Sequence, residues 1–375
     1  MKILFYYSDW TANSDRQMED TYGGVGYYRI KKVADCIKDH EVDIVGAKLT
    51  KKGETASDRW ERIFTDHDVF WSCYSSHAED AAAMYYWRDK LGKKVVLDID
   101  DNFWDVPKSH KLYDKLKETK RDRAMIGTVL SFADVITTST EPLKAKIENH
   151  MKDVYGIDKK VVVIPNFNDA TFWKHKAKKP NPKKITIGYA GSNSHNDDIE
   201  MVMPAIGKLM TKYPNLYFQT IGTIDKDGLY LFKGLTEEQR GRCEIINASS
   251  TFNSYPKRLS QVMWDIVIAP LVDSPFTRCK SHIKFMEYAM YKWPVVASRV
   301  YPYFMELHGR QLIDDGVSGL LVKPNEWFNA LDDLIQNPDK RKMLGDGAYN
   351  QVVRGWQYND SNINEIVNDL LKNMI

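Results

Sequence analysis

The sequence predicts an α/β protein made of two doubly wound domains, and three observations support this fold class. The chain has 375 residues, which is too many for one ordinary hydrophobic core. Short runs rich in valine and isoleucine alternate with longer helical patterns, which is typical of parallel sheets covered on both faces. A polar, lysine-rich segment, 169–184, interrupts the alternation once and indicates a linker. We therefore expect one domain at residues 1–168 and a second at residues 185–354.

Strands and helices follow one another in order through each expected domain. The strands expected in the first domain are 3–7, 43–47, 69–73, 94–99, 134–137 and 160–164, and the helices are 28–39, 81–91, 116–132 and 141–150. The strands expected in the second are 185–190, 216–221, 244–246, 265–269, 294–297 and 319–322, and the helices are 199–213, 255–263, 283–291, 326–335, 338–353 and 363–374. In open parallel sheets, ligands bind at the carboxyl ends of the strands. Two such units facing each other therefore predict a cleft between the domains.

Charge, cysteine spacing and apolar content exclude some classes of protein but do not identify a binding partner. A net charge of +2 excludes a polycation, although the stretches 108–123 and 174–184 are locally basic. These stretches are either solvated faces or contacts for an anionic acceptor or a membrane surface. The four cysteines are scattered without CxxC spacing, which favours thiols in a cytoplasm and no metal site. The apolar N-terminus is expected to be a first strand rather than a signal peptide, and no apolar run reaches the ~20 residues that span a bilayer.

The segment 269–298 carries the strongest chemical pattern. A strand ends, a loop follows, and a helix is expected to begin near Ser281, a good N-cap. The free N–H groups at a helix start favour an anion. Lys280, Lys284 and Glu287 recur at i, i+4 and i+7 and so share one helix face. The lysines can hold a diphosphate and Glu287 can accept two ribose hydroxyls, whereas the alternative is a surface Lys–Glu ladder.

This segment resembles the donor-binding signature of the retaining, family-four-like glycosyltransferases (glycosyl transferases group 1). In that signature a Lys-Ser…Lys-x-x-Glu-Tyr-Ala helix leads into Pro-Val-Val-Ala-Ser, as it does here. The resemblance implies the GT-B architecture, in which two Rossmann-like domains face a cleft, with Glu287 on the nucleotide ribose and Lys284 on the diphosphate. The family has a second glutamate eight residues earlier, near the sugar, where this chain has Cys279. That departure leaves the identity of the donor sugar open.

A second glycine-rich stretch follows the strand 185–190. Gly191 allows close backbone approach, and Ser192 can donate to phosphate. The stretch resembles the family's turn that faces the donor diphosphate, but the common arginine and lysine of that turn are absent. His195 is expected to replace them as the donor to phosphate, and the alternative is a capping or structural histidine.

A third stretch contains Gly23, Gly24 and Gly26 in the first β–α connection. It resembles the family's N-terminal glycine loop, which lies under the donor sugar and diphosphate. Arg29 would then approach the phosphate or the acceptor, although it could equally be a helix-surface residue.

Acidic residues end the strand 94–99 at the expected edge of the cleft. Asp98, Asp100 and Asp101 are interpreted as acceptor-binding or loop-fixing, with Asp100 or Asp101 oriented toward the cleft. Adjacent carboxylates could also bind a cation, but the resemblance implies catalysis without a metal. The residues expected to act in catalysis are Lys284, Arg29, His195 and Asp100.

The resemblance implies a function as well as a fold. A sugar would pass with retention from a nucleotide sugar, a UDP-sugar ahead of a GDP-sugar, to the hydroxyl of a polysaccharide or glycan, with no other cofactor. Trp356 and the final helix resemble the family's C-terminal segment, so residues 355–375 are expected to return to the first domain. Three alternatives stay open: a hydroxymethylated base in DNA as acceptor, a protein or small-molecule acceptor, and a non-catalytic nucleotide-sugar binder.

Overall fold

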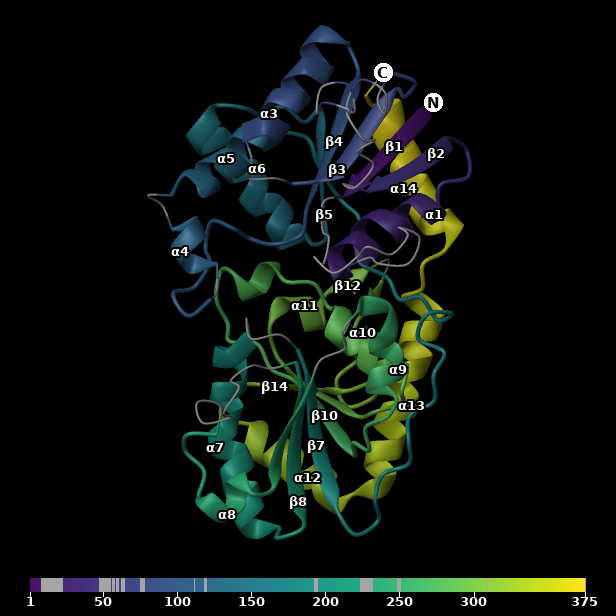
Figure 1. Cartoon of the computed structure of the whole chain (residues 1–375). Helices are drawn as coiled ribbons and strands as arrows, with labels where there is room; N and C mark the ends of the chain where they lie inside the picture. Colours follow the sequence, from purple (N-terminus) through teal and green to yellow (C-terminus); the bar gives the residue numbers. More distant parts are fainter. Residues whose placement is uncertain are drawn as a thin grey trace.

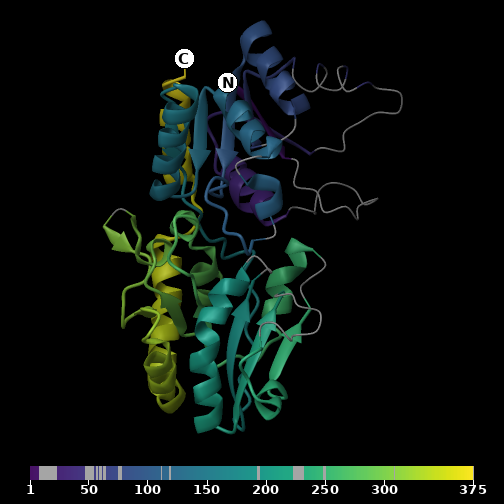
Figure 2. The ribbon, with the colours of Figure 1, turned by 90° about the vertical axis from the view of Figure 1, so that its left-hand side faces the viewer.

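The computed structural model shows two α/β domains stacked end to end, and the view turned by 90° shows the same stacking (Figures 1 and 2). It describes residues 1–7, 23–46, 55, 58, 61, 65–74, 78–110, 112–117, 120–191, 195–222, 232–247, 251–307 and 309–374. Among these residues, no helix is both long enough and apolar enough to cross a membrane.

The N-terminal domain is a six-stranded parallel sheet in the order β2-β1-β3-β4-β5-β6. The strands are β1 (Lys2–Tyr7), β2 (Glu41–Gly46), β3 (Val69–Cys73), β4 (Lys94–Ile99), β5 (Val135–Thr138) and β6 (Val161–Val163). The helical segments are η2 (Gly26–Lys31), α1 (Lys32–Asp35), α3 (Ala78–Tyr85), η3 (Tyr86–Lys90), α4 (Tyr113–Leu116), α5 (Arg121–Ser131) and α6 (Glu141–Tyr155). Strands β3, β4 and β5 are buried nearly throughout, which explains their continuous apolar character.

The C-terminal domain has a second six-stranded parallel sheet, in the order β14-β11-β10-β7-β8-β9. The strands are β7 (Ile185–Ala190), β8 (Leu216–Ile221), β9 (Cys243–Ile246), β10 (Ile266–Ala269), β11 (Val295–Ser298) and β14 (Leu320–Val322). The helical segments are α7 (Asn196–Lys212), α8 (Glu237–Arg240), η5 (Phe252–Ser254), α9 (Tyr255–Leu259), η6 (Thr277–Cys279), α10 (Ile283–Ala289), α11 (Tyr301–Phe304), α12 (Trp327–Gln336) and α13 (Pro338–Gly355). With β7 counted as the first strand of this domain, the strand order is that of the Rossmann fold. The switch point, where the strand order reverses direction, lies between β7 and β10.

The chain crosses between the domains twice, and the two crossings are hydrogen-bonded to each other. The amide of Asn168 donates to the carbonyl of Trp356 at 2.7 Å, and the amide of Tyr358 donates to the carbonyl of Asn168 at 2.8 Å. After the second crossing, α14 (Asp360–Lys372) lies beside β1 and β2, while α13 lies on the C-terminal domain (Figure 1). Asn364 and Asn368 of α14 both donate to Asp39 of the N-terminal domain, at 2.7 and 2.6 Å.

The hydrophobic core continues through the junction of the two domains. A single cluster of buried side chains includes Ile3 and Trp71 of the first sheet, Phe167 and Trp356 of the two crossings, and Phe285 of α10. Because this apolar contact is continuous, the junction fixes how the carboxyl ends of the two sheets face each other.

Every expected strand is present in the described part of the chain, and the differences concern helix starts and short elements. The expected helix 116–132 is present as α5, which begins only at Arg121. The helical turn of the first connection begins at Gly24, so Gly24 and Gly26 lie in it rather than in a loop. Helix α10 begins at Ile283, as the expected range 283–291 has it, but its N-cap is His282, so the expectation that Ser281 is the N-cap is wrong. The chain is still extended at Lys280 after the turn η6.

Several short elements were not predicted from the sequence. They are the short helices α4, α8 and α11, the helical turns η5 and η6, and the hairpin β12 (Glu306–Leu307) and β13 (Arg310–Gln311). Each is too short to show a helical or strand period in the sequence.

Candidate functional site

A cavity of about 240 Å³ lies between the two domains, at the switch point of the second sheet. The side chains that line it are Asp100 and Asp101 from the N-terminal domain and His195, Leu271, Lys280, Ser281, Ile283, Lys284, Glu287 and Tyr303 from the C-terminal domain. A larger hollow, of about 560 Å³, lies along β8 and β9 without contact from the N-terminal domain. The smaller cavity is lined by residues that the sequence singled out, namely Asp100, Asp101, His195, Lys280, Ser281, Lys284 and Glu287.

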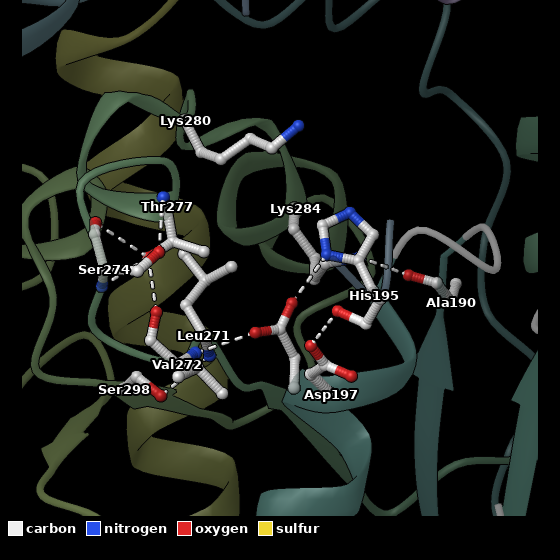
Figure 3. Close-up of polar contacts among 12 residues, drawn as sticks. Ala190, His195, Asp197, Leu271, Val272, Ser274, Thr277, Lys280, Lys284 and Ser298 are labelled. Carbon is white, nitrogen blue, oxygen red and sulfur yellow. Dashed lines mark hydrogen bonds and ion pairs between the residues drawn. The ribbon is translucent and has the colours of Figure 1, made fainter. Parts of the chain in front are cut away.

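Lys284 extends from α10 toward the end of β7. Its ammonium donates to the carbonyl of Ala190 and lies 4.4 Å from the centre of the Tyr189 ring (Figure 3). Burial lowers the pKa of Lys284 to about 8, while Glu287 and Asp198 oppose that shift. At pH 7 the charged form of Lys284 therefore predominates.

Glu287 lies one helical turn further along α10 and is nearly buried. The hydroxyl of Tyr28 is 3.3 Å from Oε1 and the hydroxyl of Tyr255 is 3.5 Å from Oε2. Burial raises the pKa of Glu287 to about 7, although the neighbouring Lys284 and both hydroxyls favour the ionised form. Tyr28 comes from the N-terminal domain, so this carboxylate is also a point of contact between the domains. No local sequence pattern pointed to a role for Tyr28 or Tyr255 beside Glu287.

The opposite wall of the cavity is acidic. Asp101, which follows β4, forms an ion pair with Lys280 across the domain boundary at 2.7 Å. Asp100 lines the same wall, and its pKa is raised to about 7 by burial and by the charges of Asp101 and Asp98. Asp100 or Asp101 was expected to face the cleft, and both line the cavity.

His195 comes from the start of α7 and lies beside Lys284 (Figure 3). Its Nδ1 is 2.8 Å from one oxygen of Asp198, and the other oxygen accepts the amide of Val272 at 2.7 Å. Burial is the main cause that lowers the pKa of His195, and Asp198 opposes it. The same carboxylate thus links the turn after β7 to the loop after β10.

The glycine-rich turn contributes less to the cavity than expected. A Cβ added at Gly191 would lie 2.4 Å from the hydroxyl of Tyr189. The lack of a side chain at Gly191 therefore makes room for the Tyr189 side chain. Ser192, expected to bind phosphate, lies outside the described residues. Gly23, Gly24 and Gly26 do not line the cavity, and a Cβ at Gly24 would lie 3.6 Å from Phe252.

Arg29 is placed elsewhere than the sequence suggested. Its side chain is 1% exposed, and its Nε and Nη2 atoms donate to Asp98 at 2.9 and 2.7 Å. Its Nη1 donates to Asn166 at 2.9 Å and to the carbonyl of Ile164, where the chain leaves the first domain. The expectation that Arg29 lies at the surface or reaches the cleft is therefore corrected: its ion pair anchors the junction.

Cys279, which stands where the family has its second glutamate, does not line the cavity. Its side chain is buried, with Sγ 3.6 Å from Nδ2 of Asn102, and its carbonyl accepts the hydroxyl of Thr140 at 3.0 Å. Burial raises the pKa of the thiol to about 11. Cys279 therefore packs one domain against the other.

The fold and this cavity define a GT-B protein, in which two Rossmann-like domains face each other across a cavity at the carboxyl ends of their strands. Comparison with solved structures agrees. HepE from Anabaena, solved with UDP and glucose, matches with a TM-score of 0.62 over 99% of each chain at 13% identity. A glycosyltransferase from Rickettsia africae matches with a TM-score of 0.63 at 15% identity, over 100% of this chain and 98% of that one.

The sucrose-phosphate synthase of Thermosynechococcus elongatus is also similar, with a TM-score of 0.60 at 14% identity over 100% of this chain and 98% of that one. No protein-family model matches the chain, and no curated protein matches its sequence. At these low identities the likeness establishes the GT-B fold, and function has to be argued from the site.

Proposed function

We propose that this protein is a glycosyltransferase that binds a nucleotide-sugar donor in the cavity between its domains. One observation carries the proposal: Lys280, Lys284 and Glu287 line a single cavity at the switch point of a Rossmann sheet. Nucleotides bind at such switch points because the strand ends and the following turns leave room for a ligand there. The bound UDP and glucose in HepE, which has the same fold, support this assignment.

The charges of the cavity fit the parts of such a donor. Lys280 and Lys284 supply positive charge for a diphosphate, and the Glu287 carboxylate can accept two ribose hydroxyls. The acidic wall of Asp100 and Asp101 then faces the sugar and the acceptor. We propose a UDP-sugar ahead of a GDP-sugar as the donor.

The proposed reaction proceeds with retention of the anomeric configuration. The bond between the anomeric carbon and the diphosphate oxygen breaks, and a bond to the acceptor oxygen forms on the same face. The leaving diphosphate takes the acceptor's proton, so no protein nucleophile is required. Lys284 stabilises the negative charge that grows on the diphosphate, and enclosure between the domains excludes water. With two lysines supplying the positive charge, we propose that no metal ion is needed.

The proposed acceptor is a polysaccharide or glycan, and the proposed location is the cytoplasm. All four cysteines are described and are thiols in the structure, which supports a reducing compartment.

A two-stage experiment tests the proposal. A thermal-shift panel of UDP-sugars and GDP-sugars first identifies the donor, because a ligand that binds only the folded state raises the unfolding temperature. Release of nucleoside diphosphate is then measured with glycan acceptors and, in parallel, with hydroxymethylated DNA. Stabilisation and glycan-dependent release support the proposal, and DNA-dependent release moves the acceptor to the DNA alternative. Stabilisation without release by any acceptor identifies a non-catalytic binder, and the absence of any stabilisation refutes the donor site.

A further inference from the structure

We propose that Asp198 holds His195 with its Nε2 toward the cavity, and that His195 takes up one proton from solvent there when the donor's diphosphate binds. The proposal rests on the proposed function, since it assumes that the cavity receives a diphosphate. It makes His195 a titratable phosphate ligand and Asp198 its positioning residue.

The geometry fixes which nitrogen of His195 carries the proton in the free protein. A carboxylate only accepts hydrogen bonds, so Nδ1, 2.8 Å from Asp198, is the donor. Asp198 is itself held, because its second oxygen accepts the Val272 amide at 2.7 Å and its side chain is only 6% exposed. In the neutral ring, Nε2 is therefore an acceptor, and the ring lines the cavity.

The charges around His195 come from every element packed against it. They are Asp198 of α7, Lys280 before α10, Lys284 and Glu287 of α10, and Asp100 and Asp101 after β4, whereas the carboxylate of the adjacent Asp197 accepts the hydroxyl of Ser109. Burial and the two lysines keep the pKa of His195 below its ordinary value, so the ring is neutral at pH 7.

A diphosphate bound among these groups changes the pKa of His195. Its negative charges offset those of Lys280 and Lys284, and a phosphate oxygen offers Nε2 an acceptor, so the pKa of the ring rises. One proton moves from solvent to Nε2, and no other bond forms or breaks. Asp198 favours the resulting imidazolium because it already accepts from Nδ1, as a carboxylate beside a histidine does.

Thermodynamic linkage predicts the direction in which donor affinity changes with pH. Binding that takes up a proton becomes weaker as pH rises, by at most about tenfold per pH unit between the pKa in the free protein and the pKa in the complex. An arginine–lysine pair at this place would bind phosphate without that dependence near neutral pH.

The experiment is isothermal titration of UDP and of GDP into the full chain at about pH 7, in two buffers of different ionisation enthalpy. The difference between the buffers gives the number of protons taken up. His195→Asn keeps an amide that can donate to Asp198 but lacks Nε2. Asp198→Asn removes the carboxylate, and Asp197→Asn is the matched control, because its carboxylate accepts the hydroxyl of Ser109 instead. His195→Gln serves as a second variant if the asparagine variant does not fold.

We expect the wild type and Asp197→Asn to take up the same number of protons, His195→Asn to take up close to one fewer, and Asp198→Asn to take up fewer than the wild type. Glu287 and Asp100 also titrate near pH 7. The test of the proposal is therefore the difference in proton uptake between each variant and the wild type. Equal uptake by the wild type and His195→Asn overturns this inference and leaves the donor site intact. Failure of both UDP and GDP to bind the wild type overturns the proposed donor site, and the inference with it.

Discussion

Replacing Lys284 with methionine removes one positive charge from the cavity and keeps an unbranched side chain over the Tyr189 ring. In the wild type the ammonium lies 4.4 Å from the centre of that ring and is bonded to the carbonyl of Ala190. A unit charge about 4 Å from a phosphate oxygen contributes at most about 4 kcal/mol at an effective dielectric constant of about 20. Removal of one stabilising donor from an active site typically costs about 2.7–4 kcal/mol of activation free energy.

Because Lys280 remains in the cavity, the expected loss in kcat lies between about tenfold and about a thousandfold, or about 1.4 to 4 kcal/mol. The assay is the release of nucleoside diphosphate at saturating donor and acceptor. The wild-type kcat/KM for the donor should also decline above about pH 8, since kcat/KM depends on the free protein, in which the pKa of Lys284 is about 8. The methionine variant should lack that decline.

Lys292→Met is the matched control, because Lys292 is exposed and pairs with Asp346 at 2.9 Å outside the cavity. Thermal unfolding of both variants checks that they are folded, since loss of one hydrogen bond costs only about 1 kcal/mol. A kcat for folded Lys284→Met within about twofold of the wild-type value would refute the assignment of this lysine to the diphosphate.

Three further predictions concern the carboxylate of the cavity and two structural positions. Glu287→Gln should raise the KM for the donor more than it lowers kcat, since only the ionised carboxylate accepts both ribose hydroxyls. Because the pKa of Glu287 is about 7, the loss of donor affinity relative to the wild type should grow as pH rises through 7. Arg29→Met leaves a buried carboxylate without its partner, so calorimetry should show a loss of about 3–5 kcal/mol of stability; an unchanged unfolding temperature would contradict the anchoring role. Gly188→Ala puts a Cβ 1.9 Å from the Trp264 ring and should lower the unfolding temperature by at least about 3 °C, whereas Gly234→Ala, with nothing within 4 Å, should not.

Much of the fold could be predicted from the sequence, because parallel strands buried on both faces leave continuous apolar runs. The expected strands at 69–73, 94–99, 185–190 and 216–221 have the bounds that the structure shows. Helix caps were less predictable, and the N-cap of α10 is an example. The expected start at Ile283 is the one that the structure shows, but the chain is extended at Lys280 and the N-cap is His282 rather than Ser281.

The candidate site could be predicted only where its residues are close in sequence. Lys280, Lys284 and Glu287 lie within eight positions, so the period of one helix was enough to group them. Tyr28 is 259 positions from Glu287, and no local pattern connects the two. Asp198 lies three residues after His195, but many residue pairs have that spacing, and the bond between them shows only in the structure.

The sequence by itself determined the two α/β units and the basic and acidic side chains at the ends of particular strands, because each of these depends on neighbours along the chain. The tertiary structure decided which ends face each other and therefore what each side chain does. Arg29 illustrates the difference, since its position after a glycine-rich stretch suggested a phosphate contact. Folding instead places it against Asp98 and Asn166, where burial requires its charge to be paired. The cavity exists because the continuous core at the junction brings the end of β4 opposite α10, an arrangement that depends on contacts between residues far apart in the chain.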